Sequence, residues 1–382
     1  MMLRKKMFVV NEPKLSPGTN LLLGTPVKVS LDNTWPIEEI LVFVNVTCGA
    51  TGPTLTGADN LLGIVKKIGL SINDNNQPRS IVDFTGVGML EYVQHAGMTL
   101  DSATLNAVGL CQGASIANNL NFRICYRIPL VHPAIGEPLR SRMLLPVHTW
   151  NQQPVLTLEF EQAANMYSAG SVSAVSAEVV LIRRNMNAAD TAAIFSSGGF
   201  LSFDLIETAA AIPVGQAGDV RIAVNGPGSY LNLLMRQYKG GATITRAELD
   251  ETTTVGSETK WRLESGGVAE HEWRWKHLKA INDFSQAQNS ANQTYSPVIG
   301  GTIAANTSYS PSVSTMLDFL DDGIPGDGVT ELGSVLDVNT PLRSGLKMEI
   351  VGRVASVATN GSTLYVGGHR VYGDLSQWQA KK

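Results

Sequence analysis

Alternation of apolar and polar side chains is the clearest pattern in the first half of the chain. In residues 122–128 every second side chain is apolar, beginning with Phe122, and residues 155–161 show the same period of two. Residues 177–182 form a nearly continuous apolar run. A period of two places one set of side chains on one face of a β-strand, and a continuous run is typical of a strand covered on both faces. We therefore expect strands at all three segments.

Further strand-like segments occur in both halves of the chain. In the first half they lie at residues 40–46 and 61–72. In the second half they lie at residues 201–205, 220–224, 230–238, 261–264, 316–320, 334–338, 346–354 and 364–372. These segments number five in the first half and eight in the second, and we expect about six to eight strands in each half, the number that a jelly roll or a similar sandwich requires. The long loop at residues 131–153 favours a Greek-key sandwich over a meander.

Three segments predict helices among these strands. A short helix is expected at residues 87–96, and another at residues 190–195. The strongest helical pattern covers residues 269–284, where apolar or aromatic side chains share one helical face: Trp273, His277, Ala280 and Phe284. A helix of that length can cover the end or flank of a sandwich.

The predicted joint of the chain is a segment of small residues at 185–199. The sequence on either side of it contains enough strand signal for a whole sandwich. We expect an all-β protein with a few short helices, built as two jelly-roll sandwiches in tandem over residues 35–184 and 200–376. Residues 1–34 predict an N-terminal arm, ordered only against a partner or its own domain, and residues 377–382 a polar tail.

Composition agrees with this interpretation and narrows the function classes. The chain has 382 residues, of which 43% are hydrophobic and only 16% charged, with 37 glycines and 17 prolines. Such a composition can fill more than one core and is typical of many strands joined by turns. The net charge of −4 argues against broad binding to a phosphate backbone, and we expect no sequence-specific nucleic-acid partner.

Cysteine usage and apolar runs give two further limits. Cys48, Cys111 and Cys125 cannot form a full disulfide framework and lack the spacing of metal ligands, so small buried thiols are expected. The apolar run after the basic start is too short for an export signal. No stretch approaches the roughly 18 to 20 apolar residues that would span a bilayer. We therefore expect a soluble product, or one attached to a larger body by its surface.

Candidate chemical sites are few. His271 and His277 are six residues apart, so on one helix they could not share a metal. Glu159 and Glu161 would share one face of a strand, which a glycosidase could use, but a solvated outer face is favoured. One acidic turn has oxygens that suit calcium, yet without the known loop spacing: Asp318, Asp321, Asp322 and Asp327. We predict no catalytic, cofactor or metal site.

The basic N-terminus is a candidate contact site. Arg4, Lys5 and Lys6, with Phe8 nearby, would suit an anionic membrane surface or nucleic acid. The alternative is an ordinary frayed terminus, and the sequence does not separate the two.

The order of segments resembles a known family. The resemblance is carried by residues 121–133 (NFRICYRIPLVHP), 154–170 (PVLTLEFEQAANMYSAG) and 218–241 (GDVRIAVNGPGSYLNLLMRQYKGG). In this order they resemble the double jelly-roll major capsid proteins of tailless, membrane-containing icosahedral bacteriophages and, more distantly, adenovirus-type hexons. The resemblance extends from about residue 37 to residue 372. It is one of element order, without a short invariant motif.

This resemblance implies an architecture and a function. Each chain would hold two eight-stranded sandwiches side by side, and three copies would form a pseudo-hexagonal trimer that tiles an icosahedral virion shell, with penton or other capsid proteins as further partners. The arm would face an internal membrane. The loops at residues 131–153, 243–260 and 286–311 would form outer decorations or neighbour contacts. The protein would be non-enzymatic, without cofactors, and located in the virion after assembly in the host cytoplasm.

Two other function classes remain open at this stage. A carbohydrate-binding double sandwich, such as a virion receptor-binding spike, would place exposed aromatic side chains on one loop face. The candidates are Trp150, Trp273, Trp275 and Trp378. A glycan hydrolase on a β scaffold would instead need two carboxylates about 5 to 9 Å apart in a cleft.

Overall fold

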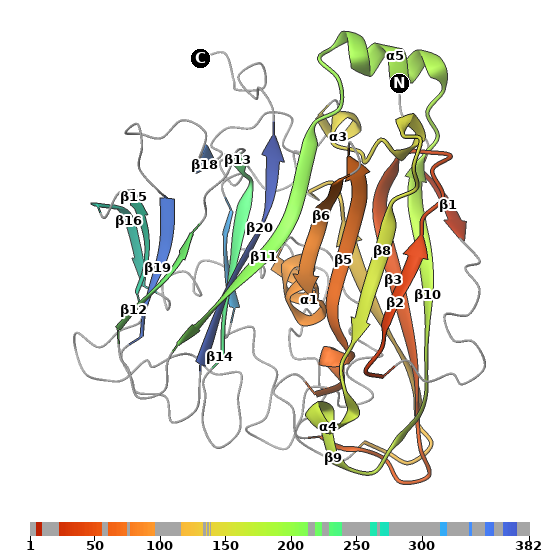
Figure 1. Ribbon diagram of the computed structural model, residues 1–382, viewed down its shortest axis with the longest axis vertical. Coiled ribbons are helices and arrows are strands. Elements are labelled where there is room, and N and C mark those ends of the chain that lie inside the picture. Colours follow the sequence, from red (N-terminus) through yellow and green to blue (C-terminus); the bar gives the residue numbers. More distant parts are fainter. Residues whose placement is uncertain are drawn as a thin grey trace, which may run out of the picture. The chain divides into compact units, whose positions relative to one another are not determined.

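A computed structural model gives the fold of the chain (Figure 1). It describes residues 5–9, 23–55, 60–74, 77–95, 116–132, 135, 137, 139–212, 218–223, 229–238, 260–265, 268–274, 314–318, 336–337, 348–354 and 362–372. The described residues form two compact units, one up to Leu205 and the other from Ile206 onward.

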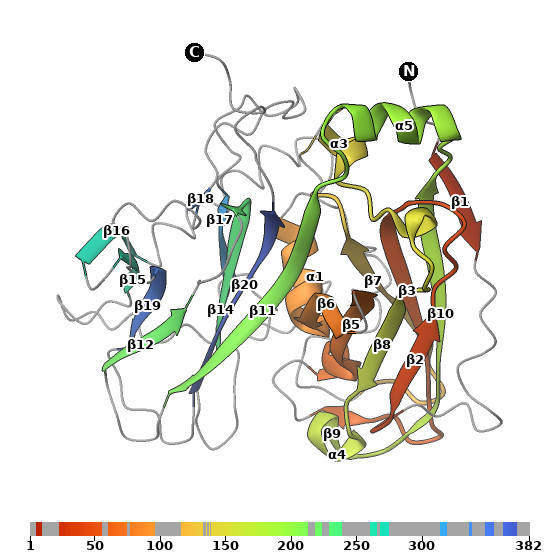
Figure 2. The ribbon, with the colours of Figure 1, turned by 45° about the horizontal axis from the view of Figure 1, so that its top comes forward.

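Two antiparallel sheets face each other in the first unit (Figures 1 and 2). One sheet has, in spatial order, β1 (Lys5–Val9), β10 (Val172–Arg184), β3 (Ile37–Cys48) and β7 (Asn121–Pro129). The other sheet contains, in spatial order, β6 (Gln77–Thr85), β5 (Val65–Asp74), β8 (Val155–Phe160) and β2 (Pro26–Ser30).

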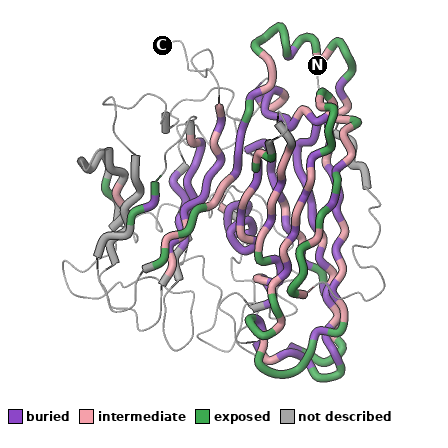
Figure 3. Tube along the Cα trace, in the orientation of Figure 1, coloured by how far each residue is buried: buried purple, intermediate pink, exposed green. Residues whose placement is uncertain are grey.

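The core of the first unit lies between these sheets. Along β8 half-buried and buried residues alternate, and Leu156 and Leu158 are fully buried. Figure 3 shows how much of each strand in this unit is buried. The helix α1 (Gly86–His95) adds Tyr92, whose ring meets Phe84 edge to face at 5.9 Å between centroids. Buried rings and branched side chains of this kind supply most of the favourable free energy of folding.

Short elements complete the first unit. They are β4 (Thr54–Leu55), η1 (Asn60–Ile64), α3 (Leu139–Arg142), η2 (Val147–Thr149), α4 (Ala163–Met166), β9 (Tyr167–Ala169) and α5 (Ala188–Ser196). The helix α5 starts at a capping box, since Asn187 accepts a hydrogen bond from the Asp190 backbone N–H at 2.8 Å and the Asp190 carboxylate accepts one from the Asn187 N–H at 3.2 Å. These bonds satisfy donors that a helix start leaves open.

The second unit is also built from antiparallel strands. Its strands are β11 (Ser202–Ile212, which begins in the first unit), β12 (Gly218–Ala223), β13 (Ser229–Tyr230), β14 (Asn232–Tyr238), β15 (Lys260–Ser265), β16 (Val268–Arg274), β17 (Ser314–Asp318), β18 (Leu336–Asp337), β19 (Met348–Val354) and β20 (Ser362–Tyr372). The strand order β17-β14-β20-β11 belongs to the same ten-stranded sheet as β6, β5, β8 and β2. The other sheet has the order β12-β19-β15-β16, while β13 pairs with β18 and β20.

A buried ion pair lies in the first of these sheets. Arg236 of β14 donates to Glu207 of β11 at 2.6 Å, and both side chains are 2% exposed. The guanidinium of Arg236 also lies 4.5 Å from the ring centre of Tyr365 on β20. Because each charge is paired where water is excluded, the three strands are fixed in one register.

Several pairs of successive strands lie in opposite sheets, although β5 and β6, and β15 and β16, are hairpin neighbours in one sheet. In the first unit β2 and β3 belong to opposite sheets, and so do β7 and β8; in the second unit β11 and β12, and β19 and β20, do the same. Such crossings are the hallmark of Greek-key and jelly-roll sandwiches. The expected all-β fold with a few short helices is confirmed, as are the short helices now seen as α1 and α5.

The prediction of a helix at residues 269–284 is wrong for the residues that the structure describes. Residues up to Arg274 form β16, which pairs with β15 from Ser265 opposite Val268 to Lys260 opposite Arg274. Only two glycines separate the paired ends in the sequence, which is the length of a tight hairpin connection. Pairing with β15 therefore outweighed the helical spacing of the aromatic side chains, and residues 275–284 lie outside the described residues.

Two smaller differences concern the first unit. The segment at residues 61–72 is not one strand, because the 3-10 helix η1 occupies residues 60–64 before β5 begins. The strand β6 was not expected, since its first residues are polar. None of the helices in the described ranges combines the length and the apolar character that a bilayer-spanning helix requires.

Candidate assembly surfaces and the buried ion cluster

The outer face of the β1-β10-β3-β7 sheet is a half-exposed wall of interlocked side chains. Arg123 on β7 donates from Nε to Asn45 Oδ1 on β3 at 2.7 Å, and its guanidinium lies 5.3 Å from the ring centre of Phe43. Arg127 makes a two-point hydrogen bond with Glu39, at 2.6 and 3.1 Å. These cross-strand contacts restrict the long side chains, so this face would lose little side-chain entropy when another surface covers it.

A buried ion cluster joins this sheet to the long loop between β7 and β8. Glu38 at the start of β3 is 3% exposed and binds the guanidinium groups of Arg140 in α3 and Arg184 at the end of β10. Arg184 also contacts Glu137 at 3.2 Å, and Arg140 donates to the Ile135 carbonyl at 3.0 Å. One carboxylate between two arginines thus ties α3 to the ends of two strands.

The electrostatics of Glu38 follow from these neighbours. Burial alone would raise the pKa of Glu38, but the hydrogen bonds and charges of Arg184 and Arg140 lower it to about 2. Glu38 is therefore ionised near neutral pH and remains so well into the acidic range. Because the cluster contains the partners that its charges need, it serves to fix the loop and offers no spare acid or base for catalysis.

The helix α5 presents an exposed apolar surface at one end of the first unit. Phe195 is 57% exposed, the one large hydrophobic side chain in the described residues with that much surface in water. Its ring meets Phe200 edge to face at 5.7 Å, and Phe200 meets His148 in the same way at 5.9 Å. His148 Nε2 lies 3.3 Å from the Thr191 hydroxyl. The helix is therefore held firmly while Phe195 projects outward.

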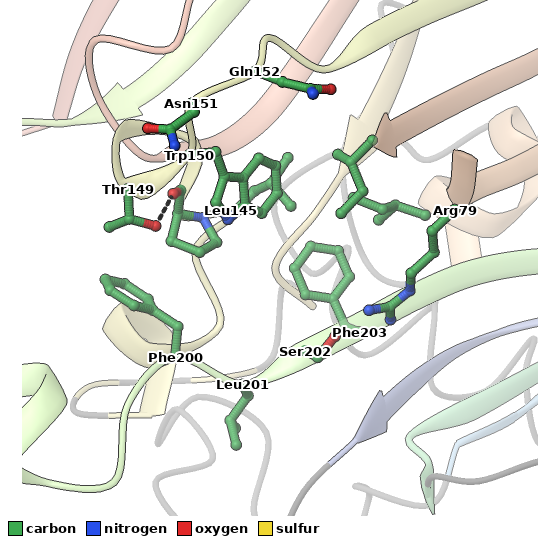
Figure 4. A pocket seen from close by; sticks show the side chains of 13 residues that line it. Arg79, Leu145, Thr149, Trp150, Asn151, Gln152, Phe200, Leu201, Ser202 and Phe203 are labelled. Atoms are coloured by element: carbon green, nitrogen blue, oxygen red, sulfur yellow. Dashed lines mark hydrogen bonds between the residues drawn. The ribbon is translucent and has the colours of Figure 1, made fainter. Parts of the chain in front are cut away.

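A cavity of about 640 Å³ lies in the first unit (Figure 4). Its walls come from β5 and β6, from the segment at residues 145–152 and from residues 200–203. The second wall is fixed because Leu145 and Ile37 exchange both backbone hydrogen bonds, at 2.9 and 3.0 Å. The third wall is fixed by the Leu201 N–H, which donates to the Arg142 carbonyl at 2.8 Å.

Three of the four predicted N-terminal contact residues lie in β1. The strand β1 pairs with β10 and forms the edge of its sheet. The paired positions are Lys5 with Arg184, Lys6 with Arg183, and Phe8 with Leu181. Arg4 lies outside the described residues. Since Arg184 precedes α5 by only four positions, the pairing brings Lys5 to the end of the first unit that carries α5. The contact with a membrane or the shell interior stays a prediction.

The cysteines and histidines do not gather into a site within the described residues. Cys48 is buried, and burial raises the pKa of its thiol, while Cys125 is half-buried and Cys111 lies outside the described part. No group of three or more His, Cys, Asp or Glu side chains with metal-binding geometry occurs in the described ranges. His271 lies on β16 rather than on a helix, and His277 falls outside.

Two of the acidic residues named in the sequence analysis interact with neighbouring side chains in the described part of the chain. Glu161 accepts from the Asn165 side chain at 2.8 Å beside α4. The pKa of Lys67 is raised by its hydrogen bond and charge interaction with Asp83 and, to a smaller extent, by the charge of Glu159. Asp318 lies in β17, and the other three residues of the acidic turn are not among the described residues: Asp321, Asp322 and Asp327.

The chain is similar to solved structures but has no match in the comparisons of sequence. No family model and no curated protein matches the sequence. The major capsid protein of Sulfolobus turreted icosahedral virus matches over 99% of this chain and 100% of its own, with a TM-score of 0.62 and 15% identity. The PBCV-1 virus capsid matches over 98% and 96%, with a TM-score of 0.55 and 11% identity. The major capsid protein of bacteriophage PM2 matches over 97% and 98%, with a TM-score of 0.51 and 9% identity.

These matches cover 97 to 99% of the chain and therefore extend over both units. At such low identity they show the fold, and they agree with the strand order that alternates between two sheets in each half of the chain. The chain has the double jelly-roll fold of viral major capsid proteins.

Proposed function

We propose that this chain is a major capsid protein, which self-associates into trimers of pseudo-hexagonal outline that tile an icosahedral virion shell. The observation that carries the proposal is the match over 99% of this chain and 100% of a capsid protein with the same tandem sandwiches. A shared fold alone allows other functions. Here the likeness covers both sandwiches rather than one of them.

The described surfaces suit this role. A sandwich closes most of its strand hydrogen bonds internally, so its side wall can be covered by a neighbour at small cost. The wall around Phe43 and Arg123, with its cross-strand contacts, is such a surface. Two sandwiches per chain give six per trimer, and six similar bodies fill a hexagonal outline that packs into a lattice. Catalysis and cofactors have no part in this function.

The N-terminal segment is proposed to face the inside of the shell. We assign Arg4, Lys5, Lys6 and Phe8 to contact with an internal membrane, because basic side chains beside an aromatic ring suit an anionic lipid surface. In this assignment residues 1–34 are an arm whose β1 is tied to the first sandwich, and residues 185–199 connect the sandwiches. Penton and other capsid proteins would be further partners. Before assembly the protein would accumulate in the host cytoplasm.

Size-exclusion chromatography with light scattering, followed by negative-stain microscopy, tests the proposal. The expected particle has three times the mass of the 40.9 kDa chain and a hexagonal outline. A Phe43→Glu, Arg123→Glu variant should lose trimers if that wall is an interface, and Lys66→Glu on the exposed side of the other sheet is its control. A wild-type protein that stays monomeric at all concentrations would contradict the proposal.

A further inference from the structure

The helix α5 is attached to the first unit by few contacts. It lies at one end of that unit, and Figure 3 shows it exposed along most of its length. Ile194 is its one buried side chain. Among the described residues, one hydrogen bond joins a side chain of α5 to the body of the unit, between the Thr191 hydroxyl and His148 Nε2 at 3.3 Å. An element with so few buried contacts belongs to the parts of a fold that open most easily.

His148, in η2, is central to the contacts that hold the helix. Its ring meets Phe200 edge to face at 5.9 Å between centroids, and Phe200 meets Phe195 of α5 in the same way at 5.7 Å. The chain just after α5 has an anchor of its own, because Arg142 Nε donates to the Gly199 carbonyl at 2.7 Å. The first turn of α5 therefore depends on His148 directly, and its last turn depends on a ring that His148 supports.

The surroundings of His148 favour the neutral ring. Its Nδ1 is buried and has no hydrogen-bond partner among the described residues. A neutral imidazole can leave Nδ1 as an acceptor, but an imidazolium carries an N–H at both nitrogens. Protonation would therefore create a buried donor without an acceptor, which is costly. Burial lowers the pKa of His148 below its ordinary value of 6.5.

The charges near His148 do not offset this cost. The neighbouring elements carry three charged side chains: Asp190 on α5, and Arg140 and Arg142 on α3. Asp190 closes the capping box of α5, and Arg140 binds Glu38. Arg142 is positive and, like the N-terminal end of the α5 dipole, disfavours a second positive charge nearby. The turn η2 contains no other charged residue.

We propose that His148 is an acid-sensitive latch for α5: the neutral ring holds the helix on the first unit, and protonation opens it. Opening uncovers the apolar side chains of Phe200 and Ile194 at this end of the unit. The two consecutive glycines at residues 198–199, both at positive φ, give the chain after the helix the backbone freedom that such a movement needs. The latch consists of residues of the first unit alone, so it goes beyond the proposed shell function and does not rest on it.

The latch acts over a defined range of pH. Because the pKa of His148 in the closed state lies below 6.5, its contribution to closing α5 is fully present above pH 6.5. The contribution is lost as the pH falls below that value toward the lowered pKa. Each pKa unit between the open and the closed state changes the ratio of open to closed α5 by about tenfold.

Hydrogen exchange of the full-length protein, followed by mass spectrometry, tests the latch. Protection factors of peptides from residues 187–198 are compared between about pH 7.5 and about pH 5, at a concentration where light scattering gives one mass at both. We expect the wild-type protection of α5 to fall about tenfold or more on acidification. His148→Gln keeps a hydrogen-bonding group opposite Thr191, and His148→Phe keeps a ring against Phe200. Neither side chain takes up a proton, so both variants should lose this decrease.

His132→Gln is the matched control, because His132 is buried elsewhere in the unit and its pKa is lowered to about 3 by burial and by Arg140. Acid weakens the unit through His132 as well, but its replacement should leave the decrease in α5 protection unchanged. Equal wild-type protection of α5 at both pH values would overturn the latch. A wild-type decrease that persists in either His148 variant would also overturn it. The particle mass, measured in parallel, reports on the shell function separately.

Discussion

Glu38 shows how much a single buried carboxylate can contribute to this fold. Its two arginine partners, Arg140 and Arg184, come from segments about a hundred and more residues away in the sequence. Replacing it by Gln keeps the shape but removes the charge that Arg184, 7% exposed, needs in its buried position. We expect Glu38→Gln to lower the free energy of unfolding by about 3 kcal/mol.

Glu137→Gln is the matched control, because Glu137 also contacts Arg184 but is 46% exposed. Its cost should stay below about 1 kcal/mol, as for other solvent-exposed ion pairs. Urea denaturation of both variants measures the difference. Equal losses from the two changes would mean that the cluster does not hold the loop as described.

The same cluster predicts how stability changes with pH. The folded-state pKa of Glu38, about 2, lies below its ordinary value of 4.5, so its contribution is fully present above pH 4.5 and is lost as the pH falls toward 2. The wild-type free energy of unfolding should therefore decrease over this range more steeply than that of Glu38→Gln. Denaturation curves collected between pH 6 and pH 2 test this, and parallel pH profiles for the two proteins would contradict it.

A further residue-level prediction concerns Gly170, between β9 and β10. Its φ is +78°, and a Cβ there would lie 2.1 Å from the Gly52 carbonyl oxygen. Gly199 has a similar φ of +80°, but its nearest new contact would be an ordinary 3.9 Å. Gly199→Ala should cost about 1 kcal/mol from backbone strain, and Gly170→Ala about 1–3 kcal/mol more. Thermal unfolding of both variants measures the difference, and equal melting temperatures would refute the close approach.

At the scale of elements, sequence periodicity predicted strands better than it predicted their partners. The alternation from Phe122 and the apolar run at residues 177–182 correspond to β7 and β10, because each strand buries one or both faces against the same core. The helical spacing of side chains after residue 268 led to a wrong prediction, because the strand there is stabilised by pairing with β15. Such pairing is a tertiary contact that cannot be inferred from local spacing. The cavity and the ion cluster could not be predicted, because each joins residues far apart in the chain. Only Trp150 was marked beforehand, as an aromatic candidate.

The edge strand β1 gives a prediction about an element. Met7 lies opposite Ile182 of β10, so cysteines at these two positions should form a disulfide within one chain under mild oxidation. Met7→Cys with Leu181→Cys is the control, because consecutive residues of β10 point to opposite faces of the sheet. Non-reducing mass spectrometry identifies the linked peptides. A link between two chains instead of within one would mean that β1 belongs to a neighbouring copy in solution.

At the scale of the whole molecule, the tandem sandwiches would explain how a chain with the proposed capsid function could build a closed shell. Each half of the chain has a four-stranded sheet of its own and contributes strands to one ten-stranded sheet, so a single chain supplies two similar building blocks. In the proposed trimer, three chains would give near-sixfold contacts around a threefold axis, which a single sandwich per chain could not give without six separate copies. The exposed small side chains of α5 would then allow neighbours to approach closely.

Cryo-electron microscopy of the purified particle tests this claim most directly, because it counts the sandwiches and their symmetry together. The account predicts a threefold particle in which six jelly-roll densities surround the axis, two from each chain. A ring of three sandwiches, or a particle in which only one half of each chain forms the ring, would contradict it.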